Sequence, residues 1–174
     1  MPFDLQPVLR GDLLTLRPLR ADDFDELYAV ASDPLIWEQH PDKTRSDRDG
    51  FRKFFHEAIA SGAALSATDN ATGAMIGSSR FHGYDSGADE VEIGWTFLAR
   101  SHWGGRYNGE MKRLMLTHAF RFVNRVVFLV GPDNIRSQRA VERIGGVRAG
   151  MRTDAASGRE NVVFAITADS FSCR

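Results

Sequence analysis

The pattern of apolar and polar positions divides the chain near Gly62. Before it, residues 13–20 alternate as expected for a strand, and residues 21–33 repeat apolar side chains at helical spacing. An Asp-Pro pair ends that helix, because a residue before proline is disfavoured in the α conformation. A second helix is predicted from Ser46, as its N-cap, to Gly62, with a phenylalanine-rich apolar face.

Beyond Gly62 the pattern is that of a meander followed by alternating helices and strands. The turn sequences NATG and DSGAD separate three strand-like runs, and a continuous apolar run at 125–130 is typical of a buried parallel strand. This order predicts an α+β or mixed α/β layer fold, in one domain over residues 1–174. The predicted elements are strands at 64–69, 74–84 and 90–98, a helix at 107–122, a strand at 125–130, a helix at 135–144 and a strand at 160–167.

Composition narrows the classes of function. The chain has 22 Lys and Arg against 23 Asp and Glu, so its near-zero net charge gives no electrostatic footprint for nucleic acid. The single cysteine, Cys173, rules out an internal disulfide and a cysteine metal site, and the five histidines lack metal-binding spacing. No apolar run approaches the roughly 20 residues that span a bilayer. The N-terminal residues lack the features of a signal peptide, so a cytoplasmic location is expected.

The loop WGGRYN, residues 103–108, stands between a predicted strand and a predicted helix. The N–H groups at a helix N-terminus and the helix dipole favour an anion there, and glycine lets the backbone approach it closely. The loop matches neither GxxxxGK[ST] nor GxGxxG, which counts against a nucleotide-binding P-loop or Rossmann motif. On its own, a tight turn explains the loop equally well.

A second segment changes this interpretation. The apolar strand at 125–130 leads into NIRS, residues 134–137, and a helix that ends at paired glycines. Together with WGGRYN, it resembles the GNAT superfamily of acetyl-CoA-dependent N-acetyltransferases, and in particular the ribosomal-protein N-terminal acetyltransferases. In that branch the loop commonly reads W-G-x-G-Y-A, and the next strand leads into N-x-R-S. The resemblance covers nearly the whole chain.

The resemblance implies a GNAT-like acyl-CoA N-acyltransferase fold. Its central sheet is mostly antiparallel, is flanked by helices and contains two parallel strands that splay apart, with a bulge expected near Gly94. The family's general loop pattern, Q/R-x-x-G-x-G/A, places its small residues where this chain has Arg106 and Asn108. We expect Gly104 and Gly105 to supply the backbone freedom instead, with Arg106 turned toward a CoA phosphate or solvent. In the other interpretation, the loop is shifted and weakens or loses CoA.

The resemblance also implies acetyl-CoA as co-substrate and no metal. By the resemblance, Asn134 corresponds to the family asparagine that hydrogen-bonds the pantetheine arm; capping of the following helix is the alternative, and the two roles can coexist. The residues expected to bind acetyl-CoA are Phe97, Leu98, Trp103, Gly104, Gly105, Arg106, Tyr107, Asn108, Asn134 and Ser137.

Two residues are catalytic candidates. Glu92 is expected on the strand face opposite Val91, Ile93, Trp95 and Phe97, where burial would make its carboxylate a general base; the alternative is an exposed strand residue or a salt-bridge partner. By the resemblance, Ser137 would protonate the leaving thiolate, and its alternative role is helix capping. Glu160, at the start of the last predicted strand, is a further candidate for the base by analogy with the family, and a surface charge is the alternative.

The acceptor is the least determined part of the prediction. Trp37, Glu38 and His40 lie in the region where relatives shape the acceptor pocket, and packing of Trp37 against the core is the alternative. The expected partner is an amine, either a small molecule or a protein N-terminus, with no nucleic acid or membrane; a homodimer is one option. The competing hypotheses are a catalytically inactive CoA-binding sensor or interaction module, and a nucleotide-dependent enzyme.

Overall fold

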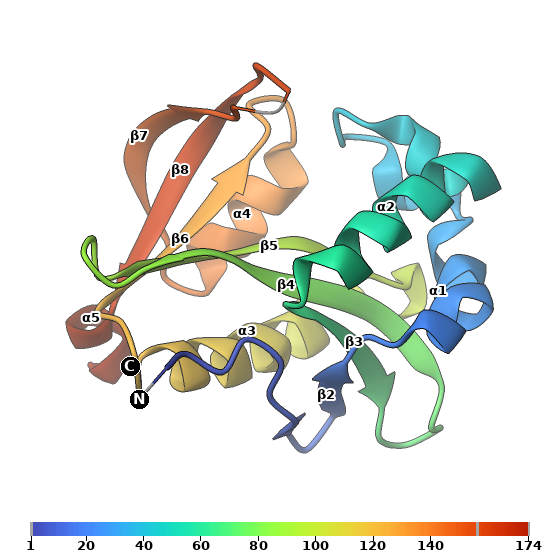
Figure 1. The fold of residues 1–174 in the computed structure, drawn as a ribbon, viewed down its shortest axis with the longest axis horizontal. Helices are drawn as coiled ribbons and strands as arrows, with labels where there is room; N and C mark the ends of the chain where they lie inside the picture. Colours follow the sequence, from blue (N-terminus) through green and yellow to red (C-terminus); the bar gives the residue numbers. More distant parts are fainter. Residues whose placement is uncertain (1, 156, 174) are drawn as a thin grey trace.

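One eight-stranded sheet organises the molecule, with the strand order β1-β2-β3-β4-β5-β6-β8-β7. The computed structural model describes residues 2–155 and 157–173 (Figure 1). The strands are β1 (Leu9–Arg10), β2 (Leu14–Pro18), β3 (Ala64–Asp69), β4 (Met75–Asp85), β5 (Glu90–Leu98), β6 (Arg125–Val130), β7 (Val147–Thr153) and β8 (Glu160–Thr167).

Helices cover both faces of this sheet. The α-helices are α1 (Phe24–Ala31), α2 (Arg48–Ser61), α3 (Arg106–Ala119), α4 (Ile135–Arg143) and α5 (Ala168–Ser172), and the short 3-10 helices are η1 (Ala21–Asp23), η2 (Pro34–Trp37), η3 (Lys43–Ser46) and η4 (Arg100–His102). Among the described residues, no helix is both long and apolar enough to cross a membrane.

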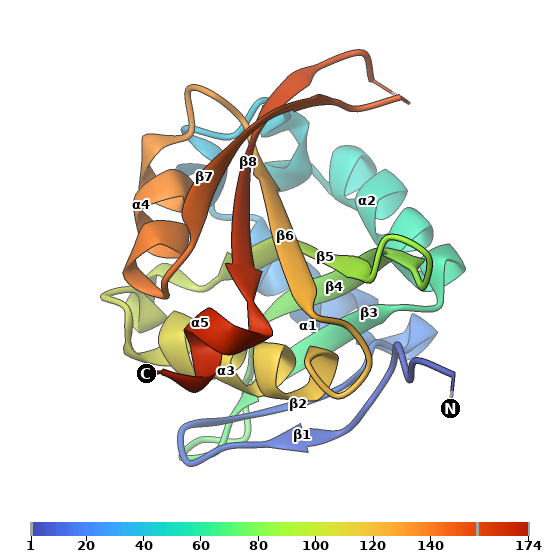
Figure 2. The same ribbon diagram turned by 90° about the vertical axis from the view of Figure 1, so that its left-hand side faces the viewer.

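The only parallel pair of the described sheet, β5 with β6, is short. Its register joins Glu90 to Arg125, Val91 to Val126 and Glu92 to Val127, and the pairing ends there. Beyond this point the two strands diverge, so that β6, β8 and β7 rise away from the β2–β5 part of the sheet (Figures 1 and 2). A gap therefore opens between two neighbouring strands at the carboxyl end of both.

Two apolar clusters fill the two faces. One lies under α3 and α4 and includes Met111, Met115 and Val141 from these helices, packed on alternate residues of β5, β6 and β8. The other lies under α1 and α2, where Phe51 and Phe54 pack with Trp37 from η2. The phenylalanine-rich helix face predicted from the sequence supplies Phe51, Phe54, Phe55 and Ala58 to this second cluster.

The predicted fold class is confirmed, because the sheet is mostly antiparallel, holds one splayed parallel pair and is flanked by helices. The strand prediction at 125–130 coincides with β6, which does pair in parallel with β5. Ser46 as the N-cap of α2 is wrong, because Ser46 ends η3 and Asp47, with an extended backbone, occupies that position. Strands β1 and β7 and helix α5 were not predicted; every residue of β7 is exposed, so it carries no alternating apolar signal.

Candidate active site

A bulge in β5 shapes the gap between the splayed strands. On β4, Ser78 pairs with Phe97 and Arg80 pairs with Gly94, so two residues of β5 stand opposite one residue of β4. Trp95 occupies the bulge with φ of 52°, a left-handed conformation that is costly for a bulky side chain. The bulge expected near Gly94 is confirmed.

The bulge also reverses which side chains face each helix layer. Ile93 packs in the cluster under α3, whereas Phe97 packs in the cluster under α2. Glu92 pairs with His82 and, with Trp95 and Phe97, lies on the α2 side. The expectation that Trp95 and Phe97 lie opposite Glu92 is therefore wrong, because simple alternation ignores the extra residue of a bulge.

The WGGRYN loop forms the N-terminus of α3. Gly104 and Gly105 have φ of 112° and 101°, and Gly105 is the N-cap of the helix. Arg106 and Asn108 lie inside α3, where side chains are tolerated, so the glycines supply the backbone freedom as predicted. Glycine as the N-cap makes no side-chain capping bond, and a helix N-terminus of this kind has N–H groups and a dipole that favour an anion.

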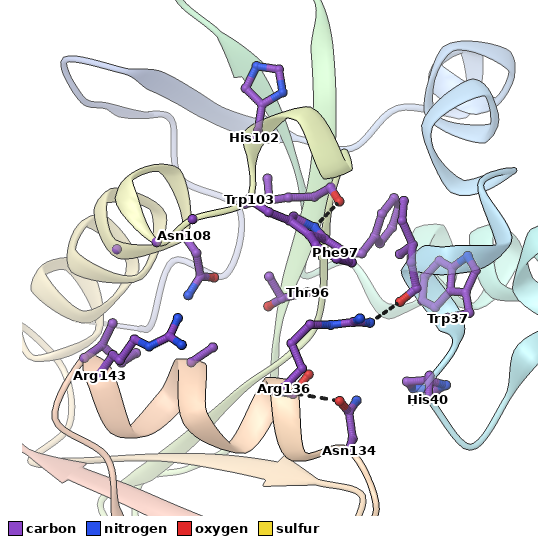
Figure 3. Close-up of a pocket in the computed structure, with 18 residues that line it drawn as sticks. Trp37, His40, Thr96, Phe97, His102, Trp103, Asn108, Asn134, Arg136 and Arg143 are labelled. Atoms are coloured by element: carbon purple, nitrogen blue, oxygen red, sulfur yellow. Dashed lines mark hydrogen bonds between the residues drawn. The ribbon is translucent and has the colours of Figure 1, made fainter.

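Two cavities meet in the gap between β5 and β6. The first, of about 470 Å³, runs from the glycine loop past the start of α4 (Figure 3). The second, of about 200 Å³, extends between Gly94 and Trp95 on β5 and Phe128 on β6. They share lining residues from η2, β5, α3 and α4, among them Thr96, and therefore adjoin. The combined space has the size of a small-molecule site.

Most of the residues expected to bind acetyl-CoA line the first cavity. These are Phe97, Leu98, Trp103, Gly104, Gly105, Asn108, Asn134 and Ser137. Arg106 and Tyr107 are not among the lining residues: Arg106 is exposed, and the Tyr107 hydroxyl donates a hydrogen bond to Asp69, 3.1 Å away. Arg143, in the last turn of α4, also lines this cavity, with its side chain toward Asn108 (Figure 3); the sequence prediction did not include it.

Asn134 and Ser137 are held together at the start of α4. The buried Asn134 side chain accepts a hydrogen bond from the Ser137 backbone N–H at 3.2 Å, which caps the helix. Both residues nevertheless line both cavities. The capping and cavity-lining roles thus coexist, since capping uses only the Asn134 carbonyl oxygen and the Ser137 main chain.

Arg136, between these two residues, ties three parts of the cleft together. Its guanidinium donates to the Ile36 carbonyl at 2.9 Å and lies over the Trp103 ring, 4.3 Å from the centroid (Figure 3). The Trp103 indole N–H donates to the Leu98 carbonyl at 3.0 Å. Arg136 is part of the NIRS motif, but the sequence prediction assigned roles only to Asn134 and Ser137.

The Glu92 carboxylate lies next to the second cavity. A side chain on Gly94 would place its Cβ 3.0 Å from Glu92 Oε1, so glycine leaves the space that this carboxylate uses. Burial raises the pKa of Glu92 to about 7, against the opposing effect of the positive charge of Arg152. Glu92 is thus half-ionised near neutral pH, the property that a general base requires. Glu160, by contrast, is an exposed residue at the start of β8.

The predicted acceptor loop divides into buried and exposed residues. Trp37 is 3% exposed, donates from its indole N–H to the Ala31 carbonyl at 2.8 Å, and also lines both cavities. His40 lines both cavities too, and burial lowers its pKa to about 4, so it is neutral. Glu38 is exposed and lines neither cavity.

Lys112 is a buried charged residue that the sequence prediction did not single out. It is 4% exposed, lines the second cavity from α3, and donates a hydrogen bond to the Thr96 hydroxyl in the bulge of β5. Burial lowers its pKa to about 7. Its spacing from Met115 and Leu116 places it on the core face of α3, a signal that was available in the sequence.

Among residues 2–155 and 157–173, no three His, Cys, Asp and Glu side chains gather as a metal site would require.

The comparisons with known proteins agree with this geometry. A family model described as "Acetyltransferase (GNAT) domain" matches residues 14–147, and the chain therefore belongs to the GNAT acetyltransferase family. The general activity of this family is the transfer of an acyl group from coenzyme A. The predicted resemblance is thereby confirmed. Among proteins with curated descriptions, none matches the chain.

Solved structures give the same fold. The chain is similar to a GCN5-related N-acetyltransferase from Brucella melitensis, with a TM-score of 0.85 and 21% identity, over 98% of this chain and 83% of the other. It is similar to an acetyltransferase from Agrobacterium tumefaciens, with a TM-score of 0.72 and 25% identity, over 92% and 94%. It is also similar to Mycobacterium smegmatis RimJ in complex with CoA-disulfide, with a TM-score of 0.65 and 20% identity, over 94% and 87%.

Lys112 makes stability depend on pH. In the folded chain its pKa is about 7, whereas an exposed lysine titrates near 10.4, so between these values the unfolded state binds more protons and stability rises with pH. We expect Lys112→Met to be more stable than the wild type near pH 6.5, with an advantage that shrinks by roughly 1 to 3 kcal/mol toward pH 9.5. Denaturant unfolding of both proteins at both pH values measures this difference in the free energy of unfolding.

The exposed Lys53 on α2 provides the matched control. Lys53→Met should shift stability little and equally at both pH values. A pH-independent difference between Lys112→Met and the wild type would show that Lys112 keeps an ordinary pKa in the folded protein.

Proposed function

We propose that this protein is an N-acetyltransferase that transfers the acetyl group of acetyl-CoA directly to a primary amine within a ternary complex. The observation that carries the proposal is a pair of adjoining cavities, with the glycine-capped N-terminus of α3 at the first and the Glu92 carboxylate next to the second. A helix N-terminus suited to an anion and a basic group beyond it suit a phosphorylated thioester donor and an amine acceptor.

The donor would lie along the first cavity. The N–H groups at the start of α3 would hold the pyrophosphate, and Arg143 would add positive charge on the opposite wall. The pantetheine arm would then pass the Asn134 amide, which keeps its N–H₂ donors after capping α4. This path leads to the point where β5 leaves β6, and where backbone groups of β5 lose their β6 partners.

The chemistry would take place in the second cavity. Glu92 would remove a proton from the attacking amine, directly or through water, as the nitrogen bonds to the thioester carbon. The β5 backbone beyond the parallel pairing offers N–H groups for the oxyanion of the tetrahedral intermediate. When the C–S bond breaks, the Ser137 hydroxyl would donate to the departing thiolate.

Panels of amines, with and without acetyl-CoA, test this proposal. Release of CoA thiol should depend on an amine, and acetyl-CoA should bind in its absence. Binding without thiol release from any amine would support the CoA-binding module instead. Thermal stabilisation by ATP or NAD and not by CoA would indicate a nucleotide-dependent enzyme. Cytoplasmic location and a homodimeric state stay sequence predictions, which cell fractionation and sedimentation would check.

Glu92→Gln tests the base. In the wild type, kcat/KM should rise with pH through about 7 as the buried carboxylate ionises, because only the carboxylate accepts a proton. The variant should lose about 100-fold or more of kcat/KM, together with the inflection near pH 7. Glu160→Gln, at the exposed carboxylate on β8, is the matched control and should keep the wild-type profile. The same inflection in Glu92→Gln would remove Glu92 from the mechanism.

Gly105→Val tests the anion site. A valine at φ of 101° is strained, and its side chain would cover the helix N-terminus, so the Kd for acetyl-CoA should rise. We expect a rise of roughly tenfold or more, measured by calorimetry. Gly73→Val imposes a similar strain, at φ of 75°, in the turn between β3 and β4, and should leave the Kd unchanged. Equal affinity in both variants would place the pyrophosphate elsewhere.

A further inference from the structure

Arg80, on β4, is a buried arginine whose hydrogen-bonding groups are not matched by the protein. It is 6% exposed, and within residues 2–155 and 157–173 its Nε and Nη2 atoms have no hydrogen-bond partner. Arg80 also forms no ion pair within that part of the chain. Leaving a buried charged donor unsatisfied is costly, so such a group calls for a physical explanation.

Stacking explains why Arg80 is held in place but not what its N–H groups bind. Its guanidinium carbon lies 4.4 Å from the Trp95 ring centroid and 5.8 Å from that of Phe54. Cation–π stacking uses the flat face of the guanidinium, whereas the N–H groups point outward in its plane. Nε and Nη2 together form one edge of that plane, which matches the two oxygens of a carboxylate.

A second arginine stands beside the first. The Arg45 guanidinium carbon lies 4.8 Å from the same Phe54 ring, and its Nε has no hydrogen-bond partner in the described chain, although an Asp42 oxygen lies 3.5 Å away. Burial lowers the pKa of Arg80 to about 10, and the charge of Arg45 acts in the same direction. The protein thus holds two cations close together at a net cost, which an anion between them would offset.

The position of this pair connects it to the acceptor end of the cleft. Arg45 and Trp95 line the second cavity, and Arg80, which does not line it, lies directly behind Trp95, on whose ring it stacks. Arg80 pairs with Gly94 and His82 with Glu92, so Arg80 and Glu92 are diagonal neighbours on one face of β4 and β5. The fields of Glu57 and Glu92 reach Arg80, but neither carboxylate pairs with it in the described chain.

We propose that Arg80, supported by Arg45, binds a carboxylate of the acceptor, so that the preferred substrate is an amine that carries a carboxylate near its nitrogen. This inference rests on the proposed function. The amine would face Glu92 while the carboxylate meets the Nε–Nη2 edge of Arg80. Two sources offer this chemistry: a free amino acid, and a peptide N-terminus with an acidic side chain in its first residues.

Matched acceptor pairs test the carboxylate and separate the two sources. One arm compares a free amino acid with its carboxamide, and the other compares a peptide that has aspartate at its second position with the asparagine peptide. Each rate is divided by the fraction of the acceptor whose amine is unprotonated at the pH of the assay, so that acceptors with different amine pKa values can be compared. In at least one arm, kcat/KM should be about tenfold or more higher for the carboxylate, the worth of a charge-assisted hydrogen bond.

Arg80→Gln should reduce that preference to about one, chiefly through KM, because glutamine keeps polarity but loses the charge and the bidentate edge. Arg52→Gln, at an exposed arginine on α2 that pairs with Asp49, is the matched control and should keep the preference. No preference in the wild-type enzyme, or an unchanged preference in Arg80→Gln, would overturn the proposal. Thermal unfolding checks that each variant is folded.

A binding measurement keeps the inference separate from the proposed activity and from the variant's folding. Succinate should raise the Tm of the wild-type protein, whereas neutral succinamide should not, and Arg80→Gln should lose the succinate shift. Succinate should also inhibit turnover competitively against the amine. Succinate binding without thiol release from any amine would support the anion site and reject the acetyltransferase. Amine-dependent thiol release, with no effect of succinate and no preference for a carboxylate, would support the acetyltransferase and reject the anion site.

Discussion

The bulge of β5 at Trp95 is the constraint on which the cleft depends. Parallel pairing with β6 lasts for three residue pairs, up to Glu92, and the bulge follows three residues later. A bulge increases strand twist, so β5 turns away from β6 and the gap between them receives both cavities. The φ of 52° at Trp95 is an unfavourable conformation for a large aromatic residue. Stacking of Arg80 on its ring and packing against His82 help to hold it.

The same bulge places two buried ionisable groups on opposite sides of one strand. Glu92 lies on the α2 side, and Lys112 reaches Thr96 from the α3 side. Burial brings the pKa of each to about 7, upward for the carboxylate and downward for the amine. They differ in surroundings, however. Lys112 lines the second cavity and contacts two hydroxyls of the sheet, from Ser79 and Thr96, so it supports the bulge, whereas Glu92 lies next to that cavity beside Gly94.

Sequence patterns predicted the structure of the half of the cleft proposed for the donor better than that of the half proposed for the acceptor. The glycine loop, the NIRS segment and the parallel strand can be found because they consist of backbone requirements: positive φ, a helix cap and a buried extended run. Lys112 and Arg80 were not predicted as site residues. Hydrophobic periodicity indicates which face of a helix or strand is buried, but not which polar residues are buried on that face. The face on which Trp95 lies was predicted wrongly for another reason. A bulge inserts an extra residue and so breaks the two-residue alternation of side chains along the strand.

This difference has a physical origin. A pyrophosphate and a pantetheine arm can be held by main-chain N–H groups and one amide, so the proposed donor site needs few particular side chains. The acceptor end is built instead from side chains of η2, η3 and β4 that meet only in the folded chain, with Trp37, Arg45 and Arg80 around the Phe54 ring. Arg45 stacks on the Trp37 and Phe54 rings, and Arg80 stacks on the Phe54 ring, so we expect a change in one of these side chains to alter the position of the others. If this end of the cleft binds the acceptor as proposed, the choice of acceptor depends on two buried arginines held by aromatic rings, an arrangement that no local sequence motif encodes.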